Sequence, residues 1–378
     1  MTRTGYDPSS ATVVEVSFAS TITAVDTPIV PPPDTPYIAP AWIDLQVNGY
    51  AAVDYNSPET PQEEIVRSVK VLNSTGTGRF YPTVITGTAA NMAGALRNLA
   101  RAKQSLPSIE GFHVEGPHIS PDDGPRGAHP SGCVRPPDIE EYRRWQDASD
   151  GNVRLVTLSP EYPEAPRYIE AVVNDGVVVS IGHTKASAEQ IADAVSAGAT
   201  MSTHIGNGAH GEMRRHPNYL WDQLAEDRLA AGFIVDGVHI GAAFLKVALR
   251  AKGILRSVLV TDASMPALAT PGPYMLGEVE VELTPDNRVV LRGGDRLAGS
   301  ALRMNDAIGN VMRMAGISLP EALSMATRNP ARVGRITGRQ RGLTPGDRAD
   351  FVLFRWHKDQ ARVEVVETIV GGETVFRA

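Results

Sequence analysis

The sequence predicts an α/β fold, a (β/α)₈ TIM-like barrel with a small sheet domain, from three observations. Between residues 41 and 264, eight short runs of apolar and β-branched residues alternate with stretches of helical periodicity. The runs are almost continuously apolar, as strands of a parallel sheet buried on both faces are. Both ends of the chain instead show β-rich segments without helical periodicity. Eight strand–helix units are the number that closes a barrel.

The chain ends are expected to form one domain together. Near the amino terminus, residues 12–20 and 21–26 are β-rich, and the Pro-rich stretch 29–40 is interpreted as a connector because proline cannot donate a ladder hydrogen bond. Near the carboxyl terminus, residues 349–356, 361–370 and 372–378 alternate like antiparallel strands, with a tight turn at Gly371 and Gly372. We place this domain at residues 1–42 with 339–378, and the barrel at 43–338.

The barrel strands are expected where the apolar runs lie. These are residues 41–49, 79–86, 111–116, 153–159, 177–184, 199–206, 230–239 and 257–264. Helices are expected at 61–76, which opens with proline and acidic residues, at 186–198, where Ile191, Ala194 and Val195 share a face, and at 242–253. A doubly wound open sheet is the alternative, but no Gly-rich phosphate fingerprint follows the first strand.

The amino-acid composition is that of a globular protein and argues against some classes of partner. Of the 378 residues, 42% are hydrophobic and 21% are charged, which is usual for a globular protein with a large core. The net charge of −7 argues against nucleic acid or anionic membranes as partners. No apolar run approaches the roughly 20 residues of a membrane span, and the polar amino terminus lacks a signal-peptide core, so we expect a cytosolic protein. The one cysteine, Cys133, is expected to be a buried free thiol.

Four of the predicted strands end on a polar residue that can bind a metal or move a proton. The runs GFHVEG, VVVSIGHT, ATMSTHIGN and SVLVTDAS stop at Glu115, His183, His204 and Asp262. A single such residue is more often structural, but buried polar groups cost free energy unless they are paired or ligated. Because the carboxyl ends of barrel strands meet at one face, four of them predict a site assembled there.

Three of these residues match the ligand set of a catalytic metal site. Glu115, His183 and His204 offer one carboxylate and two imidazoles, which suit zinc and similar divalent ions and leave a position open for water. Asp262 could accept a proton from that water and pass it to a leaving group. The alternative is that Asp262 caps a helix or forms a turn, as aspartate after a strand often does.

The chain resembles the N-acetylglucosamine-6-phosphate deacetylase family of the amidohydrolase superfamily. The resemblance runs from about residue 40 to the carboxyl terminus and rests on PAWIDLQVNG, HVEGP, GHT, THIGN, VDGVH, LVTDAS, LAGSALRM and GLTPGDRADFVLF. It implies a (β/α)₈ barrel with a small β-sandwich formed by both termini. It also implies that Glu115, His183 and His204 bind the metal and that Asp262 is the general acid and base.

The resemblance implies one metal ion per chain, and we expect zinc. Many amidohydrolases have a His-x-His pair at the end of the first strand, where this chain has Gln46 and Asn48. Amides bind divalent cations far more weakly than imidazoles do. A small amino-sugar substrate is implied as the partner, with a homodimer as one expected assembly.

The resemblance also assigns the substrate contacts. His129 is implied to hydrogen-bond the developing oxyanion, which makes it a second catalytic residue. The substrate-binding set is His129, Asn207, Gly208, Arg215, His239, Gln46 and Asn48. Arg215 is implied to bind phosphate through its planar guanidinium fork, with the neighbouring Arg214 as the alternative.

The segment after the sixth strand departs from the family pattern. An aromatic residue is lost, glycines stand at Gly206 and Gly208, and His210 adds a polar group. The leading hypothesis, which the resemblance implies, is hydrolysis of the N-acetyl amide of N-acetylglucosamine 6-phosphate. The alternatives are an unphosphorylated or differently configured N-acyl sugar, and a sugar-binding barrel without catalysis.

Overall fold

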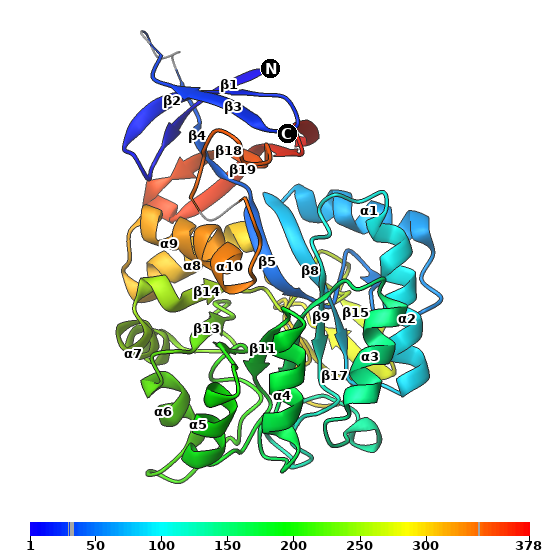
Figure 1. Ribbon diagram of the computed structural model, residues 1–378. Helices are drawn as coiled ribbons and strands as arrows, with labels where there is room; N and C mark the ends of the chain where they lie inside the picture. The colour runs from blue at the N-terminus through cyan, green and yellow to red at the C-terminus, as the bar shows by residue number, and fades with distance from the viewer. Residues whose placement is uncertain (29, 31–33, 339–340) are drawn as a thin grey trace.

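The computed structural model describes residues 1–28, 30, 34–338 and 341–378, and its larger part is a parallel eight-stranded barrel surrounded by helices (Figure 1). The barrel strands in chain order are β5 (Trp42–Val47), β8 (Thr77–Ile85), β9 (Phe112–Glu115), β10 (Val153–Leu158), β11 (Val178–Ile181), β12 (Met201–Ser202), β13 (Ala230–Phe233) and β14 (Ser257–Leu259). The helices that follow them are α1 (Gln62–Asn73), α2 (Ala89–Lys103), α3 (Ile139–Ala148), α4 (Ala165–Asn174), α5 (Ala188–Ser196), α6 (Tyr219–Ala225), α7 (Ala242–Lys252) and α8 (Met304–Ala315).

The barrel closes between its last and first strands. Beyond the end of β14, Ala263 forms a parallel bridge with Val47 at the end of β5. The backbone N–H of Asp262 donates to the carbonyl of Gln46 at 3.0 Å, and that of Asn48 donates to the carbonyl of Ala263 at 2.7 Å. The predicted barrel is therefore confirmed over the open doubly wound sheet. This seam also carries three of the residues singled out by the sequence.

The helices form where the sequence pattern places them. In α5, Ser187 accepts from the backbone of Gln190 while the Gln190 side chain accepts from the backbone of Ser187, a reciprocal cap that starts the helix. The predicted apolar face of this helix, Ile191, Ala194 and Val195, is buried. The expected helices at 61–76 and 242–253 correspond to α1 and α7.

Several predicted strands are shorter than expected, and the sixth and seventh fall furthest short. The sixth, β12, has two residues, and the seventh, β13, ends at Phe233 rather than near residue 239. In the latter case, the Asp236 carboxylate accepts from the backbone N–H groups of Val238 and His239, both at 2.8 Å. This local turn takes the backbone out of the sheet, so His239 lies on a loop.

A small antiparallel sheet between β14 and α8 was not predicted. It consists of β15 (Gly272–Leu276), β16 (Val279–Leu283) and β17 (Val289–Leu291). The remaining elements are β6 (Gly49–Tyr50), β7 (Val53–Asp54), α9 (Leu319–Ala326), α10 (Arg328–Val333) and the 3₁₀ turns η1 (Ser131–Cys133), η2 (Ile254–Arg256) and η3 (Lys358–Gln360).

Both termini contribute to one seven-stranded sheet, which confirms the predicted β-rich terminal domain (Figure 1). Its order is β20 (Glu373–Arg377), β19 (Arg362–Val370), β18 (Phe351–His357), β4 (Tyr37–Pro40), β1 (Thr2–Asp7), β2 (Thr12–Phe18) and β3 (Ile22–Asp26). The sheet curls over a core of its own, in which the rings of Phe18 and Phe351 meet edge to face with centroids 4.9 Å apart.

The terminal prediction missed one strand and was wrong about a second segment. Residues 2–7 form β1, although the polar start of the chain shows no clear strand pattern. Residues 37–40, assigned to the Pro-rich connector, form β4, which pairs with β18 on one side and with β1 on the other. Only long-range pairing makes β4 a strand. Residues 29 and 31–33 of the connector, and the proposed boundary at 339, lie outside the described residues, and the domain limits stay a prediction.

The terminal sheet contacts the amino ends of the barrel strands. Trp42, the first residue of β5, packs against Phe354 with ring centroids 5.6 Å apart. Arg79, near the start of β8, forms a buried ion pair of 2.5 Å with Asp350. The opposite face, at the carboxyl ends of the strands, is thus left for a site.

The sequence also predicts the burial of Cys133 and the lack of a membrane-spanning segment. Cys133 is only partly buried, because it lies in the short η1 turn at the surface rather than in a core element, so the expectation of a buried thiol was wrong. Within the described part of the chain, no helix combines the length and the apolar character needed to cross a membrane.

Candidate metal centre and active site

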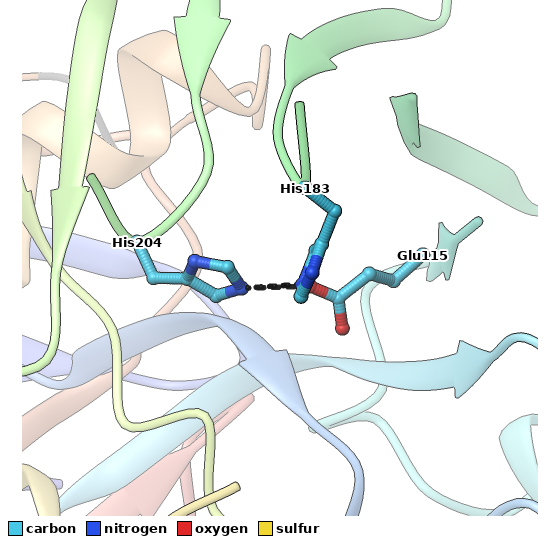
Figure 2. A group of neighbouring side chains, drawn as sticks. All are labelled: Glu115, His183 and His204. Carbon is cyan, nitrogen blue, oxygen red and sulfur yellow. Dashed lines mark hydrogen bonds and ion pairs between the residues drawn. The ribbon is translucent and has the colours of Figure 1, made fainter. Parts of the chain in front are cut away.

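Glu115, His183 and His204 converge at the carboxyl ends of β9, β11 and β12 (Figure 2). Oε1 of Glu115 lies 2.9 Å from Nε2 of His204 and 3.2 Å from Nε2 of His183, and the two Nε2 atoms are 3.2 Å apart. All three side chains are buried. Because one carboxylate oxygen and two ring nitrogens point at the same place, this set could hold a divalent metal ion.

The orientation of the His183 ring favours metal binding through Nε2. Its Nδ1 lies 2.9 Å from the backbone carbonyl of Pro125, which can only accept, so Nδ1 carries the ring hydrogen. A ring with its hydrogen on Nδ1 presents the lone pair of Nε2, which faces Glu115. A backbone carbonyl that fixes the tautomer in this way is common behind metal-binding histidines. Nδ1 of His204 is buried and has no hydrogen-bond partner among the described residues.

Three of the strand-end residues have a left-handed backbone. The φ angles are 50° at His183, 25° at His204 and 51° at Asp262, and none of these residues is glycine. Such conformations cost free energy and cluster at functional sites, where the surrounding structure maintains them. Here the turn at each strand end directs the side chain toward the barrel axis instead of continuing the strand.

Gln46 and Asn48 bind the two carboxylates of the site. Nε2 of Gln46 donates to Oε1 of Glu115 and to Oδ1 of Asp262, both at 3.0 Å. Nδ2 of Asn48 donates to the same Oδ1 at 2.7 Å. Both amides therefore engage one oxygen of Asp262, and Oδ2 receives no such donor. The Gln46 side chain does not line the pocket, whereas Asn48 does.

The pKa values of Glu115 and Asp262 are shifted in opposite directions. Burial would raise the pKa of Glu115, but hydrogen bonds from His183 and His204 outweigh it and hold the pKa well below its usual range. Burial, and then the charge of Glu115, raise the pKa of Asp262 to about 6. Two carboxylates with separated pKa values are what a metal ligand and a proton carrier need.

Asp44, which the sequence analysis did not single out, supports the seam beneath Asp262. Its carboxylate accepts from the hydroxyl of Thr261 at 2.5 Å and from the backbone N–H groups of Thr261 and Gln46 at 3.2 Å. Burial raises the pKa of Asp44 to about 7. Because Thr261 and Gln46 adjoin the site, this carboxylate ties the first and last strands together where they position Asp262.

His129 lies beside the metal-competent cluster. Its Nε2 is 3.3 Å from Nε2 of His183, and its Nδ1 is 2.8 Å from the hydroxyl of Thr86. Burial, and then the neighbouring His183, lower the pKa of His129 to about 3, so the ring is neutral near pH 7. If Thr86 donates to Nδ1, the ring hydrogen is on Nε2 and faces the site.

A pocket of about 450 Å³ opens over these side chains. Its lining includes the buried side chains of Asn48, Glu115, His129, His183, His204, Asp262 and Leu276, and the more exposed residues Gly124, Gly127, Gly206, Asn207, Gly208, His210, His239, Val279 and Arg296. His239 is held by Asp236, whose Oδ2 lies 2.6 Å from Nδ1 of the ring. Asn207 donates to the carbonyl of His204 at 3.2 Å. Most of the sequence-predicted site residues thus line one cavity.

Arg215 does not line this pocket. The chain leaves the cavity at Gly211 and runs along the surface to α6, so Arg214 and Arg215 are both exposed. Arg214 lines a separate surface groove.

Sequence reasoning missed Arg296, Leu276 and Val279, which reach the pocket from the unpredicted β15–β17 insertion and the loop after it. No motif marks them, since only the fold brings this insertion to the barrel mouth.

Gly208 packs directly against the metal-competent cluster, which leads to a first prediction. Its φ is 55°, and a Cβ there would lie 2.6 Å from Nδ1 of His183, closer than side chains tolerate. We expect Gly208→Ala to displace His183 and to weaken metal affinity by roughly 10–100-fold, the usual effect of disturbing the support of a ligand. Competition with a chromogenic chelator would measure this. Gly211→Ala, where a Cβ meets no atom within 4 Å, is the control, and equal metal affinity in both variants would contradict the prediction.

Comparisons with known proteins agree with this site. The model of the amidohydrolase family matches residues 37–375. N-acetylglucosamine-6-phosphate deacetylase of Bacillus subtilis (strain 168) is 30% identical over 90% of this chain and 84% of its own length. N-acetylgalactosamine-6-phosphate deacetylase of Shewanella sp. (strain ANA-3) is 33% identical over 89% of this chain and 82% of its own length.

The fold is also similar to that of a solved structure. An alanine variant of the Mycobacterium smegmatis N-acetyl-D-glucosamine-6-phosphate deacetylase, in complex with N-acetyl-D-glucosamine-6-phosphate, superposes with a TM-score of 0.89. The sequence identity is 28%, and the superposition covers 99% of each chain. The resemblance noted in the sequence is thereby confirmed. The chain belongs to the amidohydrolase family and is a hydrolytic enzyme related to the N-acetyl amino-sugar 6-phosphate deacetylases.

Proposed function

We propose that the protein hydrolyses the N-acetyl amide of N-acetylglucosamine 6-phosphate, giving glucosamine 6-phosphate and acetate with the help of one divalent metal ion. The observation that carries this proposal is the buried set of Glu115, His183 and His204, which lines one pocket together with Asp262. The relatives and solved structures named above act on, or bind, substrates of this class.

We assign metal binding to Glu115, His183 and His204 and expect zinc. Two imidazoles and a carboxylate are a common zinc ligand set, and the carbonyl of Pro125 fixes the His183 tautomer that binding requires. When bound, such an ion would lower the pKa of a water molecule and polarise the acetyl carbonyl.

Asp262 then acts as general base and general acid. It accepts a proton from the water that attacks the acetyl carbon and later delivers a proton to the amide nitrogen as the carbon–nitrogen bond breaks. The proton is carried on Oδ2, because Gln46 and Asn48 both donate to Oδ1. Their amide hydrogens repel a proton on that oxygen, so the side chain has one defined proton-carrying atom.

His129 stabilises the tetrahedral intermediate of this reaction. In the tautomer in which Nδ1 accepts from the hydroxyl of Thr86, the neutral ring presents its Nε2 hydrogen to the developing oxyanion. Asn207, Gly208 and His239 line the outer pocket and are proposed to contact the sugar, together with Asn48. Phosphate binding by Arg215 and direct substrate contact by Gln46 stay predictions.

A panel of N-acetyl sugars tests the proposal. We expect acetate release to be fastest with N-acetylglucosamine 6-phosphate. The Shewanella relative named for the galactosamine compound makes N-acetylgalactosamine 6-phosphate the second candidate, and it belongs in the same panel with both unphosphorylated sugars. Faster acetate release from an unphosphorylated sugar would show that the preferred substrate carries no phosphate. Binding of all four without acetate release would favour a non-catalytic sugar-binding barrel.

We expect one tightly held divalent ion per chain. A second ion would need ligands where Gln46 and Asn48 stand, and amides bind divalent cations weakly. The Gln46 side chain already bridges Glu115 and Asp262, which occupies the space between the two carboxylates. Elemental analysis of protein purified without added metal would measure the ratio, and two ions per chain would contradict it. A homodimer and a cytosolic location stay predictions.

A further inference from the structure

We propose that an apolar wall of the pocket is a subsite for acyl chains longer than acetyl, so that the enzyme also hydrolyses N-propionyl and N-butyryl amino sugars. The inference rests on the proposed function, because it extends the acyl group that this function removes. The wall consists of four side chains that line the pocket, Ile85, Leu276, Val279 and Leu297. Ile85 is the last residue of β8, and the other three come from the β15–β17 insertion and the loop after it.

The wall lies beside the two carboxylates of the site. Ile85 is paired with Glu115 in the parallel ladder between β8 and β9. Three residues after Leu297, the backbone N–H of Ser300 donates to the carbonyl of Asp262 at 2.9 Å. Both ends of the wall therefore adjoin residues at which the proposed reaction takes place.

The turn between β15 and β16 brings Leu276 and Val279 next to Ile85. A Cβ on Gly277, in this turn, would lie 3.4 Å from Cβ of Asn56. The side chain of Asn56 accepts from the backbone N–H of Ile85 at 2.7 Å. Leu276 belongs to a buried apolar cluster against which Ile85 and Val279 also pack. These three side chains thus form a connected apolar surface.

Another part of the pocket is polar and suits the sugar. Asn207, His210 and His239 line it from the loops that follow β12 and β13. The carbonyl carbon of the amide has two substituents, the nitrogen that carries the sugar and the acyl chain. Sugar hydroxyls can hydrogen-bond to these polar side chains, whereas hydroxyls buried against the apolar wall would have no partner. The sugar is therefore placed along the polar residues and the acyl chain along the wall.

The wall presents more apolar surface than an acetyl group can cover. The methyl of an acetyl group is smaller than any of the four side chains, and Ile85, Val279 and Leu297 are only partly buried. Each methylene that a longer chain buries against them should strengthen binding about fourfold.

The bonds that form and break are those of the proposed deacetylation. The oxygen of water joins the acyl carbon, the carbon–nitrogen bond breaks, and the amine nitrogen takes the proton that Asp262 delivers. The products from the longer substrates are glucosamine 6-phosphate and propionate or butyrate.

Kinetics on an acyl series test the inference. For the N-acetyl, N-propionyl and N-butyryl derivatives of glucosamine 6-phosphate, we expect kcat/KM of the longer chains to be no lower than that of acetyl. A site that fits only a methyl group would lose about tenfold or more with the first added methylene. The N-glycolyl derivative matches the propionyl compound in size but ends in a hydroxyl, so it should be the poorer substrate of the two. Lower values for both longer chains, or a glycolyl compound hydrolysed as well as the propionyl compound, would overturn the inference.

Variants of Val279, which is partly buried at the start of β16, alter the wall itself. Val279→Phe fills the space beside the wall and should lower the ratio of kcat/KM for N-butyryl over N-acetyl by roughly tenfold or more. Val279→Ser removes apolar contact and should lower this ratio about fourfold. The control is Met275→Phe, on the same hairpin but exposed and outside the pocket, which should keep the wild-type ratio. A wild-type ratio in both Val279 variants, or an equal fall in Met275→Phe, would overturn the inference.

Binding measured without turnover separates this inference from the proposed function. In calorimetric titrations of Asp262→Asn, whose amide cannot accept a proton from water, the N-butyryl compound should bind more tightly than the N-acetyl compound by about fourfold per methylene. If wild type releases no carboxylate from any acyl compound but Asp262→Asn shows this preference, the proposed function fails and the subsite stands. If wild type deacetylates the N-acetyl compound and Asp262→Asn binds both compounds equally, only the subsite fails.

Discussion

An Asp262→Asn variant is expected to keep its metal ion and lose turnover by about 10²–10⁴-fold, the contribution typical of a general acid–base group. Asparagine is close to isosteric with aspartate, but its amide cannot accept a proton from water. The buried Oδ1 already accepts from Gln46 and Asn48, so an amide oxygen in that place keeps those hydrogen bonds. The measurement is kcat for acetate release together with metal content by elemental analysis.

The matched control is Asp54→Asn. Asp54 is also buried, its pKa is also raised to about 6 by burial, and its carboxylate accepts from backbone N–H groups of Asn56 and Gly277. It does not line the pocket. Its amide can accept only one of these two hydrogen bonds, so we expect this variant to lose some thermal stability but to retain wild-type turnover per folded chain. If Asp262→Asn instead lost its metal along with its activity, Asp262 would be a metal ligand and the assigned proton transfer would be wrong.

The pKa of Asp262 also sets the expected pH dependence. Burial, and then the charge of Glu115, raise it to about 6. A general base must be ionised, so kcat/KM in the wild type should fall as the pH drops below about 6. Any residual activity of the asparagine variant should lack this acidic limb, because no carboxylate titrates at that position. An unchanged acidic limb in the variant would assign the titration to another group.

A Glu115→Gln variant is expected to lose both its metal ion and its detectable activity. Oε1 of Glu115 is the atom shared by His183, His204 and Gln46, and replacing the carboxylate by an amide removes the negative charge that a divalent cation needs. Thermal unfolding gives a readout that does not depend on turnover. Added zinc should raise the melting temperature of the wild type, since a ligand that binds the native state stabilises it, and should not raise that of the variant.

Glu161→Gln is the control for this change. Glu161 lies in the loop after β10, where it accepts from the hydroxyls of Ser120 and Ser159, and it does not line the pocket. We expect it to retain metal binding and activity. Zinc-dependent stabilisation that survives in Glu115→Gln would show that the ion binds without this carboxylate and would remove Glu115 from the ligand set.

The barrel and the deep part of the site could be predicted because both depend on local sequence. Each barrel strand is an apolar run, and Glu115, His183, His204 and Asp262 stand where a run stops. Parallel strands bring their carboxyl ends to one face, so the position of a residue at a strand end is enough to place it near the others. At three of these ends, the residue has a positive φ, a conformation that a β-strand cannot contain, so the strand stops there.

The remaining features depend on contacts between distant residues. Residues 37–40 form a strand only because β1 and β18 pair with them. Gln46 binds the carboxylates of Glu115 and Asp262, which lie next to it in space but 69 and 216 residues away in the chain. No local sequence pattern could show these contacts. Arg296 reaches the pocket through an insertion that has no motif. His239 was expected at a strand end, yet the Asp236 turn places it on a loop.

The most direct test of a metal-dependent deacetylase is acetate release from N-acetylglucosamine 6-phosphate before and after metal removal. Purified wild type should release acetate and glucosamine 6-phosphate in equal amounts. Dialysis against a chelator should abolish the reaction, and zinc added back to one equivalent per chain should restore it. Acetate release that persists in protein shown by elemental analysis to hold no metal would contradict the account. So would a fully metal-loaded protein that releases no acetate from any of the four N-acetyl sugars.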